Sequence, residues 1–347
     1  MSGLKDRIKG LEKLGCFLRN ISEEDSRYNS FFEAIDRAQS QNDWFQKKTC
    51  ITAIKSWGLA LEPDKIARWE RKYQVNENLN SKTIAVIMAG NIPLAGLHDL
   101  ISIWISGNRA LVKCASKDSI LIPFIVGIEP VFKSLTTFTD GKLEDFDAVI
   151  ATGSNNTARY FDYYFSKYPH IIRKNKNGIA VLNGSETKAE LENLGRDMLQ
   201  YYGLGCRNVS KLYLPKGFDL NLVFGGLYPY ANVIEMNKYA NNYDYNKAVF
   251  LMNGFDFLEN GFFMLKEDKS ISSPIATGYY EFYDEISSIK SHLLKQKENI
   301  QCIVSNTDIE GAIPFGRAQN PELWDYADGV DTLEFIKCLC YIMFLSF

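Results

Sequence analysis

The feature that most constrains the fold of this chain is a repeated alternation of short apolar runs with longer helical segments. Between residues 83 and 184 each apolar run has the length of a buried strand, and three segments with helical spacing separate the runs. This alternation predicts an α/β fold with a parallel sheet and right-handed crossovers. The predicted strands are 83–88, 110–113, 147–151 and 179–182, and the predicted helices are 94–105, 119–132 and 156–165. Ligands of such sheets bind at the carboxyl ends of the strands, where we look first for a site.

The regions outside this alternation have a different pattern of apolar residues. Residues 1 to about 75 carry apolar side chains three or four positions apart, which predicts a set of amphipathic helices, and 76–81 indicates a linker. A further helix is predicted from Thr187, because Thr187 and Glu190 have the T-x-x-E spacing of a capping box. The pattern from about 211 to 305 is mixed and includes several predicted aromatic strands, and the end of the chain predicts a terminal strand.

Composition excludes several classes of protein. The 347 residues hold 39 Lys+Arg and 42 Asp+Glu, a net charge of −3, so no nucleic-acid partner is expected. The longest apolar run, 335–347, is too short for a membrane span of roughly 20 residues. The polar start lacks the apolar core of a signal peptide, and seven cysteines without a CxxC pair fit a reducing compartment, so we expect a cytoplasmic protein. With only three histidines, we expect no metal site.

One of the seven cysteines has neighbours that suit a nucleophile. Cys206 follows Gly203 and Gly205 and precedes Arg207. Small neighbours let a substrate carbonyl approach the sulfur, and a nearby cation favours the reactive thiolate. The alternative is a buried thiol, which is the commonest fate of an unbridged cysteine. The other six cysteines are better explained as packing residues. Examples are Cys16 and Cys50, which lie on predicted helices, and Cys338 and Cys340, which lie in the predicted terminal strand.

Polar residues follow the predicted strands. Asn91 comes after the first strand and carries an amide that can donate to a developing oxyanion, although Gly, Asn and Pro are also ordinary turn residues. Lys113 closes the second strand and could meet a phosphate or ribose, or simply be solvated. The turn Thr152–Ser154 joins the third strand to a helix, whose first N–H groups suit phosphate. The histidines His98 and His292 fit helix faces, and His170 fits a loop.

The order and spacing of these segments resemble those of the aldehyde dehydrogenase superfamily. Within that superfamily, the segments are most similar to the LuxC-like family of acyl-CoA reductases. The resemblance covers about residues 80 to 215 and resumes near 261–263 and 314–316. The matching segments are 89–93 (A-G-N-I-P), 111–113 (L-V-K), 151–154 (A-T-G-S), 180–184 (A-V-L-N-G) and 203–210 (G-L-G-C-R-N-V-S). The resemblance implies two Rossmann-type parallel-sheet domains with an N-terminal helical segment. It implies boundaries of 1–186 for the helices and the NAD(P)-binding domain, 187–310 for the catalytic domain, and 311–347 for a segment that returns to the cofactor domain or an oligomer interface.

The same resemblance implies a role for each matched residue. Cys206 would form a thioester with the acyl group, and Asn91 with the Cys206 N–H would hold the oxyanion. Lys113 would bind the adenosine ribose of NADPH or NADH. The residues that would lie along the cofactor are Thr152, Gly153, Ser154 and Gly184. The implied reaction is the reduction of an acyl-CoA, with a fatty acyl-CoA as the expected substrate, to the aldehyde, in a homo-oligomer or with an acyl-transferring partner protein.

Two departures from the superfamily pattern leave alternatives open. The general base of the E-L-G-G motif matches Leu182, with Glu186 nearby as a candidate replacement, and the Glu of the E-x-F-G-P segment matches Ser270. Loss of the base disfavours hydrolysis and suits exchange with CoA. The alternatives are a CoA-acylating aldehyde dehydrogenase, an acyl-phosphate reductase, or a nucleotide-binding partner subunit that has lost catalysis.

Overall fold

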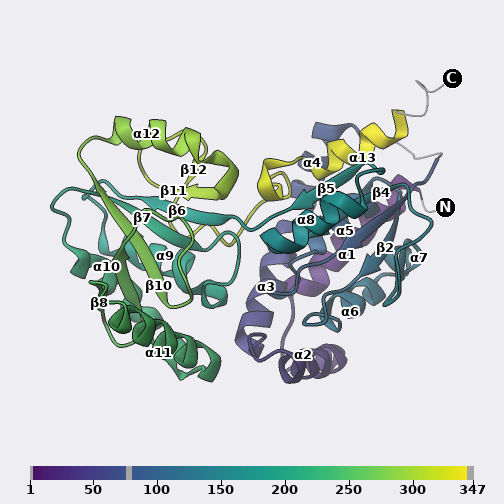
Figure 1. The fold of residues 1–347 in the computed structure, drawn as a ribbon. Coiled ribbons are helices and arrows are strands. Elements are labelled where there is room, and N and C mark those ends of the chain that lie inside the picture. Colours follow the sequence, from purple (N-terminus) through teal and green to yellow (C-terminus); the bar gives the residue numbers. More distant parts are fainter. Residues whose placement is uncertain (1–2, 76–79, 342–347) are drawn as a thin grey trace. The chain divides into compact units, whose positions relative to one another are not determined.

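The computed structural model describes residues 3–75 and 80–341. The chain divides into two compact units, described one at a time below (Figure 1). The first unit joins the residues up to Lys174 with those from Pro321 onward, and the second is Asn175–Asn320. Among the described residues, no helix combines the length and the apolar character needed to cross a bilayer.

The first unit is built on a parallel sheet with the strand order β3-β2-β1-β4-β5 among its described residues. The strands are β1 (Thr83–Ile87), β2 (Arg109–Lys113), β3 (Thr136–Phe138), β4 (Ala148–Thr152) and β5 (His170–Arg173). The chain steps outward from β1 to β2 and β3 and then returns to the other side of β1 as β4. This reversal creates a topological switch point between β1 and β4, which is where ligands bind to open α/β sheets.

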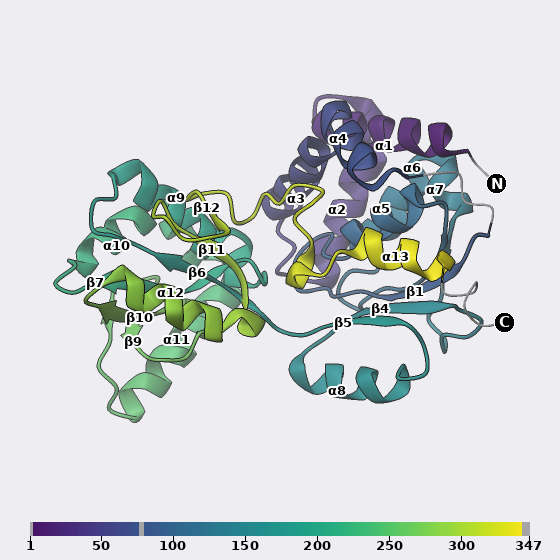
Figure 2. The ribbon, with the colours of Figure 1, turned by 90° about the horizontal axis from the view of Figure 1, so that it is seen from above.

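Helices cover both faces of this sheet. Alternate residues of β1 point to opposite faces, so Ile84 and Val86 join the large core under α5, while Ala85 packs toward α8 with Phe161. Figure 2 shows α8 on one side of the sheet and α5 with the N-terminal helices on the other. The helices of the unit are α1 (Leu4–Arg19), α2 (Asn29–Gln41), α3 (Lys47–Ala60), α4 (Pro63–Tyr73), α5 (Leu97–Ile105), α6 (Leu121–Ile128), α7 (Pro130–Ser134), α8 (Asn155–Tyr164) and α13 (Thr332–Tyr341).

The end of the described chain is a helix, and the predicted terminal strand is wrong. In α13 the buried residues Leu333, Ile336 and Leu339 recur every three positions, which is a helical spacing. Asp331 precedes the helix and accepts a hydrogen bond from the Glu334 amide at 3.0 Å, as an N-cap does. The last residues of the predicted strand, 342–347, lie outside the described residues, as does most of the predicted linker at 76–81.

The second unit is also built on a sheet, with the order β12-β11-β6-β7-β10-β9-β8 among its described residues. Its pairings are parallel except for β8 with β9. The strands are β6 (Asn177–Val181), β7 (Val209–Pro215), β8 (Leu258–Glu259), β9 (Met264–Glu267), β10 (Thr277–Tyr283), β11 (Ile300–Val304) and β12 (Ala312–Ile313). The predicted strand 179–182 is therefore real, but as β6 it belongs to this second sheet.

Helices also cover both faces of the second sheet. Figure 1 shows α12 on one face and α9, α10 and α11 on the other. The helices are α9 (Lys188–Leu199), α10 (Leu220–Leu227), α11 (Asn237–Met252) and α12 (Ile286–Lys295), with 3-10 turns η2 (Gln200–Gly203) and η3 (Tyr228–Glu235). The capping box that opens α9 is confirmed. Within the mixed region 211–305, the structure has strands β7 to β11, but it also has helices at 220–227, 228–235 and 237–252 that the sequence did not locate. The helix α11 has almost no amphipathic periodicity to reveal it.

The boundary between the units also differs from the prediction at 186/187. It falls after Lys174, because β6 pairs with β7 and β11. Residues 311–320 belong to the second unit, and the described chain from Pro321 belongs to the first. The sequence could not show which strands belong to which sheet, because the strands of both sheets are short apolar runs of the same kind.

Candidate active site

Cys206 lies in the loop between η2 and the first residue of β7. Its side chain is exposed, so it is not the buried thiol of the alternative interpretation. Because β7 begins at Val209, the thiol lies at the amino end of the strand rather than at the carboxyl end. The expectation that functional groups follow the strands therefore does not hold for this residue.

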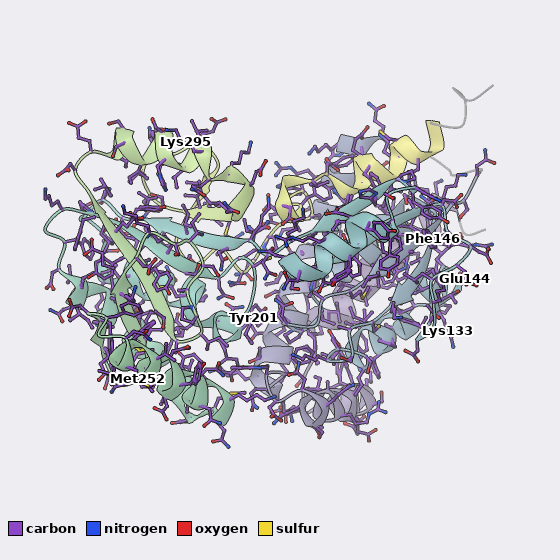
Figure 3. The ribbon with its side chains drawn as sticks, in the orientation of Figure 1. Lys133, Glu144, Phe146, Tyr201, Met252 and Lys295 are labelled. Atoms are coloured by element: carbon purple, nitrogen blue, oxygen red, sulfur yellow. The ribbon has the colours of Figure 1, made fainter. Side chains whose placement is uncertain are left out.

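The backbone just before Cys206 adopts a rare conformation. Tyr201, Tyr202 and Gly203 all have positive φ angles, of 55°, 58° and 76°. Only glycine accepts this region without cost, and strained residues of this kind cluster at functional sites. Figure 3 labels Tyr201, whose side chain is buried. The strain is retained because the surrounding structure holds the loop in place.

Asn208 is the residue that holds this loop most directly. Its side-chain oxygen accepts a hydrogen bond from the Gly205 N–H at 2.8 Å. Its amide nitrogen donates to carbonyl oxygens at the end of α9, namely those of Asp197 (3.0 Å), Met198 (3.2 Å) and Gln200 (2.8 Å). These carbonyls lack partners within the helix, so Asn208 acts as a C-terminal cap. One buried side chain thus joins the Cys206 loop to a rigid helix.

A second set of contacts ties the loop to the segment 314–318. The Asp197 carboxylate, fully buried, accepts the N–H groups of Gly316 (2.6 Å) and Ala318 (3.0 Å). Arg207 donates its Nε–H to the Ala318 carbonyl at 2.5 Å. Burial raises the pKa of Asp197 to about 6, although the two N–H bonds oppose that rise. Residues 197–207 and the segment 314–318, which are distant in sequence, therefore meet beside the candidate nucleophile.

Other thiols differ from Cys206 in their surroundings. Burial raises the pKa values of Cys50 and Cys114 to about 12 each, and that of Cys302 to about 11. Thiols with such pKa values stay protonated and are poor nucleophiles. Cys302 lies on β11 beside the loop, with its sulfur 3.6 Å from the Arg207 carbonyl oxygen. Cys16 and Cys338 are exposed but lie on helices of the first unit.

The first unit gathers four of the predicted cofactor residues and Asn91 at one edge of its sheet. Lys113 ends β2, Thr152 ends β4, and Asn91 follows β1, so all lie at the carboxyl edge of parallel neighbours. Ser154 caps α8 by accepting the Thr157 N–H at 3.2 Å. Gly153 leaves little room for a side chain, since a Cβ there would lie 3.0 Å from the Thr157 side chain. The Lys113 ammonium donates to the Gly141 carbonyl at 2.9 Å.

The loop after β1 has a buried support that the sequence did not reveal. Leu94 has a positive φ of 63°, and its N–H donates to the carboxylate of Asp118 at 3.1 Å. Asp118 is 3% exposed, and burial raises its pKa to about 7. Gly90 packs tightly on the turn before Asp118, because a Cβ added to Gly90 would lie 2.7 Å from the side chain of Ala115. The position of the exposed Asn91 thus depends on a buried carboxyl group.

Gly184 follows β6 in the second unit, whereas the other predicted cofactor residues belong to the first unit. Leu182 and Glu186 do not lie beside Cys206. They follow the end of β6, whereas Cys206 precedes the start of the parallel strand β7, so they lie at opposite edges of one sheet. Glu186 instead accepts the backbone N–H of Asn183 (2.6 Å) and Gly184 (3.0 Å). Assigning the lost general base to Leu182, or its replacement to Glu186, is therefore wrong.

The three histidines lie on helices and a strand away from the Cys206 loop in sequence. His98 is on α5, and its Nε2 lies 3.0 Å from the Leu323 carbonyl oxygen, among aromatic rings; burial lowers its pKa. His170 begins β5 rather than lying in a loop, and His292 is on α12. No group of three or more His, Cys, Asp or Glu side chains within the described ranges could hold a metal ion.

The chain thus has two α/β units on largely parallel sheets, and an exposed cysteine precedes one strand of the second unit. This architecture is the fold of the aldehyde dehydrogenases. One similar structure is aldehyde dehydrogenase 21 from Physcomitrella patens in complex with the reaction product succinate, with a TM-score of 0.68 and 11% identity over 98% of this chain and 85% of that chain. A Mycobacterium tuberculosis aldehyde dehydrogenase complexed with NAD⁺ has a TM-score of 0.61 and 12% identity over 89% and 75%.

A third similar structure is the NAD⁺ complex of an aldehyde dehydrogenase from Bacillus cereus, with a TM-score of 0.61 and 13% identity over 89% of this chain and 73% of that chain. At such identities the likeness establishes the fold. No protein-family model matches the sequence, and no curated protein matches it.

Three residues that shape the site were absent from the sequence predictions: Asn208, Asp197 and Asp118. Asn208 is two positions from Cys206, and a polar residue so close to a candidate nucleophile was a usable signal. Asp197 and Asp118 carried no such signal, because a carboxylate in an apolar segment is equally typical of an exposed helix face. Only their burial, 0% and 3% exposed, distinguishes them.

Proposed function

We propose that this chain is an NAD(P)H-dependent acyl-CoA reductase in which Cys206 carries the acyl group as a thioester. The observation that carries the proposal is the exposed Cys206 in a strained loop, which Asn208 fixes to α9, on an aldehyde dehydrogenase fold. An ordinary packing cysteine needs neither exposure nor such a support. The segments that resemble acyl-CoA reductases favour an acyl-CoA over a free aldehyde as the substrate.

The carboxyl edge of the first sheet is suited to a dinucleotide. It offers the switch point between β1 and β4, the capped N-terminus of α8, and a Gly153 that allows close backbone approach. Thr152, Gly153 and Ser154 would hold the phosphates or nicotinamide half, and Lys113 the adenosine ribose. The NAD⁺ complexes among the similar structures support this choice of cofactor. When bound, the reduced cofactor supplies the hydride that converts the acyl group to the aldehyde.

The chemistry assigned to the chain itself begins with the Cys206 thiolate. Its sulfur attacks the thioester carbonyl of the acyl-CoA, a new carbon–sulfur bond forms, and CoA leaves as a thiolate that takes up a proton. The backbone N–H of Cys206 and the Asn91 amide are the proposed donors to the oxyanion. The Asp197 carboxylate, close to this loop, accepts two backbone N–H groups and is fully buried, so it is not exposed to a water molecule that it could activate. This favours acyl transfer over hydrolysis.

The test is acyl-enzyme formation with a radiolabelled acyl-CoA, in the absence of reduced cofactor. The wild-type protein should take up about one label per chain, stable to denaturation and released by hydroxylamine. Cys206→Ala should take up none, and the matched variant Cys16→Ala, which removes another exposed thiol, should label normally. Persistent labelling of Cys206→Ala would overturn the assignment.

The alternatives have distinct outcomes in the same system. An acyl-phosphate reductase would oxidise NAD(P)H only with an acyl phosphate, and a CoA-acylating dehydrogenase would work faster from aldehyde and CoA. A partner subunit without catalysis would show no label in the wild-type protein. Assays with NADH and NADPH, across acyl chain lengths, define the cofactor and the substrate.

A further inference from the structure

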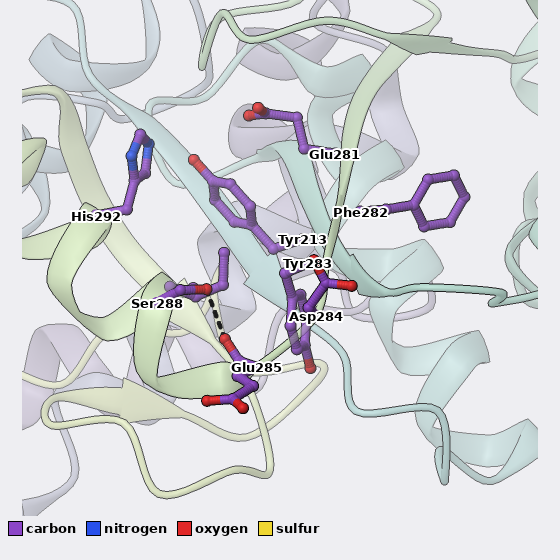
Figure 4. Close-up of a pocket in the computed structure, with 9 residues that line it drawn as sticks. Tyr213, Glu281, Phe282, Tyr283, Asp284, Glu285, Ser288 and His292 are labelled. Carbon is purple, nitrogen blue, oxygen red and sulfur yellow. Dashed lines mark hydrogen bonds between the residues drawn. The ribbon is translucent and has the colours of Figure 1, made fainter.

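We propose that the second unit carries a binding site for a small organic ammonium cation in a cavity at the carboxyl ends of β7 and β10, beside α12 (Figure 4). The cavity has a volume of 540 Å³. It is separate from the proposed chemistry: Cys206 precedes the amino end of β7, whereas Tyr213 lies near the other end, about 13 Å further along the strand from Val209.

The lining of this cavity is acidic and aromatic. Glu281, Asp284 and Glu285 contribute three carboxylates, Tyr213 and Tyr283 contribute aromatic rings, and the described residues that line the cavity include no lysine or arginine. Figure 4 shows these side chains around one space, with His292 on the α12 side. Carboxylates repel an anion, whereas carboxylates and aromatic faces together attract a cation.

Tyr213 supplies the observation that points to a ligand. Its side chain is 2% exposed, yet its hydroxyl has no hydrogen-bond partner in the described part of the chain. Buried tyrosine hydroxyls normally find a partner, so an unsatisfied one is unfavourable unless something else bonds to it. Figure 4 shows this hydroxyl between His292 and Glu281. A ligand placed there would satisfy the hydroxyl and meet a carboxylate at the same time.

The carboxylate beside Tyr213 is held firmly. Glu281 pairs in register with Tyr213 on the neighbouring strand, so their side chains share a face of the sheet. The Lys211 ammonium, fully buried, binds Glu281 at 2.7 Å and also donates to the Asp268 carbonyl. The same ammonium lies 5.4 Å from the centre of the Tyr213 ring, so its charge is shared among these protein groups. Lys216 pairs with Asp284 at 3.3 Å on the exposed rim. Three carboxylates against two occupied lysines leave the cavity negative.

A primary ammonium group matches these partners. It has three N–H donors, of which one can bond to the Tyr213 oxygen and another to a Glu281 oxygen. An apolar body attached to it can pack on Tyr283, whose ring is fixed because its hydroxyl donates to the Leu182 carbonyl at 2.6 Å. A neutral ligand of the same shape would lose the attraction of the carboxylates.

Calorimetric titration of the full chain with phenethylammonium chloride tests the proposal, with phenethyl alcohol as the neutral probe of the same shape. We expect saturable binding of the ammonium and at least about tenfold weaker binding of the alcohol. Tyr213→Phe and Glu281→Gln should each weaken ammonium binding by about tenfold. Tyr280→Phe, which removes a hydroxyl from the opposite face of β10, should leave binding unchanged.

The unfolding midpoint separates a binding role from a structural one. Because the Tyr213 hydroxyl bonds to no group in the described ranges of the chain, Tyr213→Phe should unfold at the wild-type urea concentration or a higher one. The proposal is overturned by the absence of saturable ammonium binding, by equal binding of the alcohol, by unchanged binding in Tyr213→Phe, or by a lower midpoint for that variant. Acyl labelling at Cys206 should be the same with and without the amine, so this test does not depend on the acyl-CoA reductase proposal.

Discussion

Replacing Asn208 with alanine should both destabilise the second unit and impair the chemistry of Cys206. The substitution removes the acceptor of the Gly205 N–H and the donor to three carbonyls at the end of α9. Each buried group left unpaired costs about 1–3 kcal/mol. Water can reach the exposed part of the loop, so we expect two groups to stay unpaired and the free energy of unfolding to fall by about 2–6 kcal/mol.

The assay pairs urea denaturation, followed by circular dichroism, with the acyl-CoA labelling described above. Under conditions where Asn208→Ala is still folded, we expect acyl-enzyme formation to slow by at least about tenfold, which corresponds to about 1.4 kcal/mol of lost transition-state stabilisation. Alkylation of Cys206 by iodoacetamide should persist, because the thiol itself remains. The control Asn299→Ala removes an exposed asparagine from the same unit and should change stability by less than about 0.5 kcal/mol. Wild-type stability together with wild-type labelling in Asn208→Ala would refute the role of this residue.

Three further predictions concern buried charges and thiols. Burial raises the pKa of Asp118 from 3.8 to about 7, so the folded state binds this proton more tightly than the unfolded state does. The free energy of unfolding should therefore fall by about 4 kcal/mol as the pH rises from 4 to 8. In Asp118→Asn the urea midpoint should not fall in this way over the same pH range. Asp99→Asn breaks a buried ion pair with Arg173 (2.5 Å) and should cost about 3–5 kcal/mol in thermal or urea unfolding, whereas replacing both residues with apolar ones should cost less. Mass spectrometry after brief iodoacetamide treatment at pH 8 should find Cys206 modified and Cys50 intact; the reverse order would contradict the pKa assignment.

The sequence by itself determined the class of fold and the candidate nucleophile. Apolar runs of strand length separated by helical spacing are local signals, and they identified β1, β2, β4 and β6 as strands. The capping box at Thr187 and the glycines around Cys206 are local as well. These features follow from the conformations that a few neighbouring residues allow, so they can be predicted without knowing what they pack against.

The tertiary structure alone decided which sheet each strand joins and which groups surround the site. β6 has the same texture as β4, and only its pairing with β7 places Gly184 and Glu186 in the second unit, at the edge opposite Cys206. Pairing depends on contacts between residues far apart in the chain, which periodicity does not encode. The same holds for Asn208: its position in the sequence was visible, but the three carbonyls that it caps became neighbours only when α9 and β7 packed together.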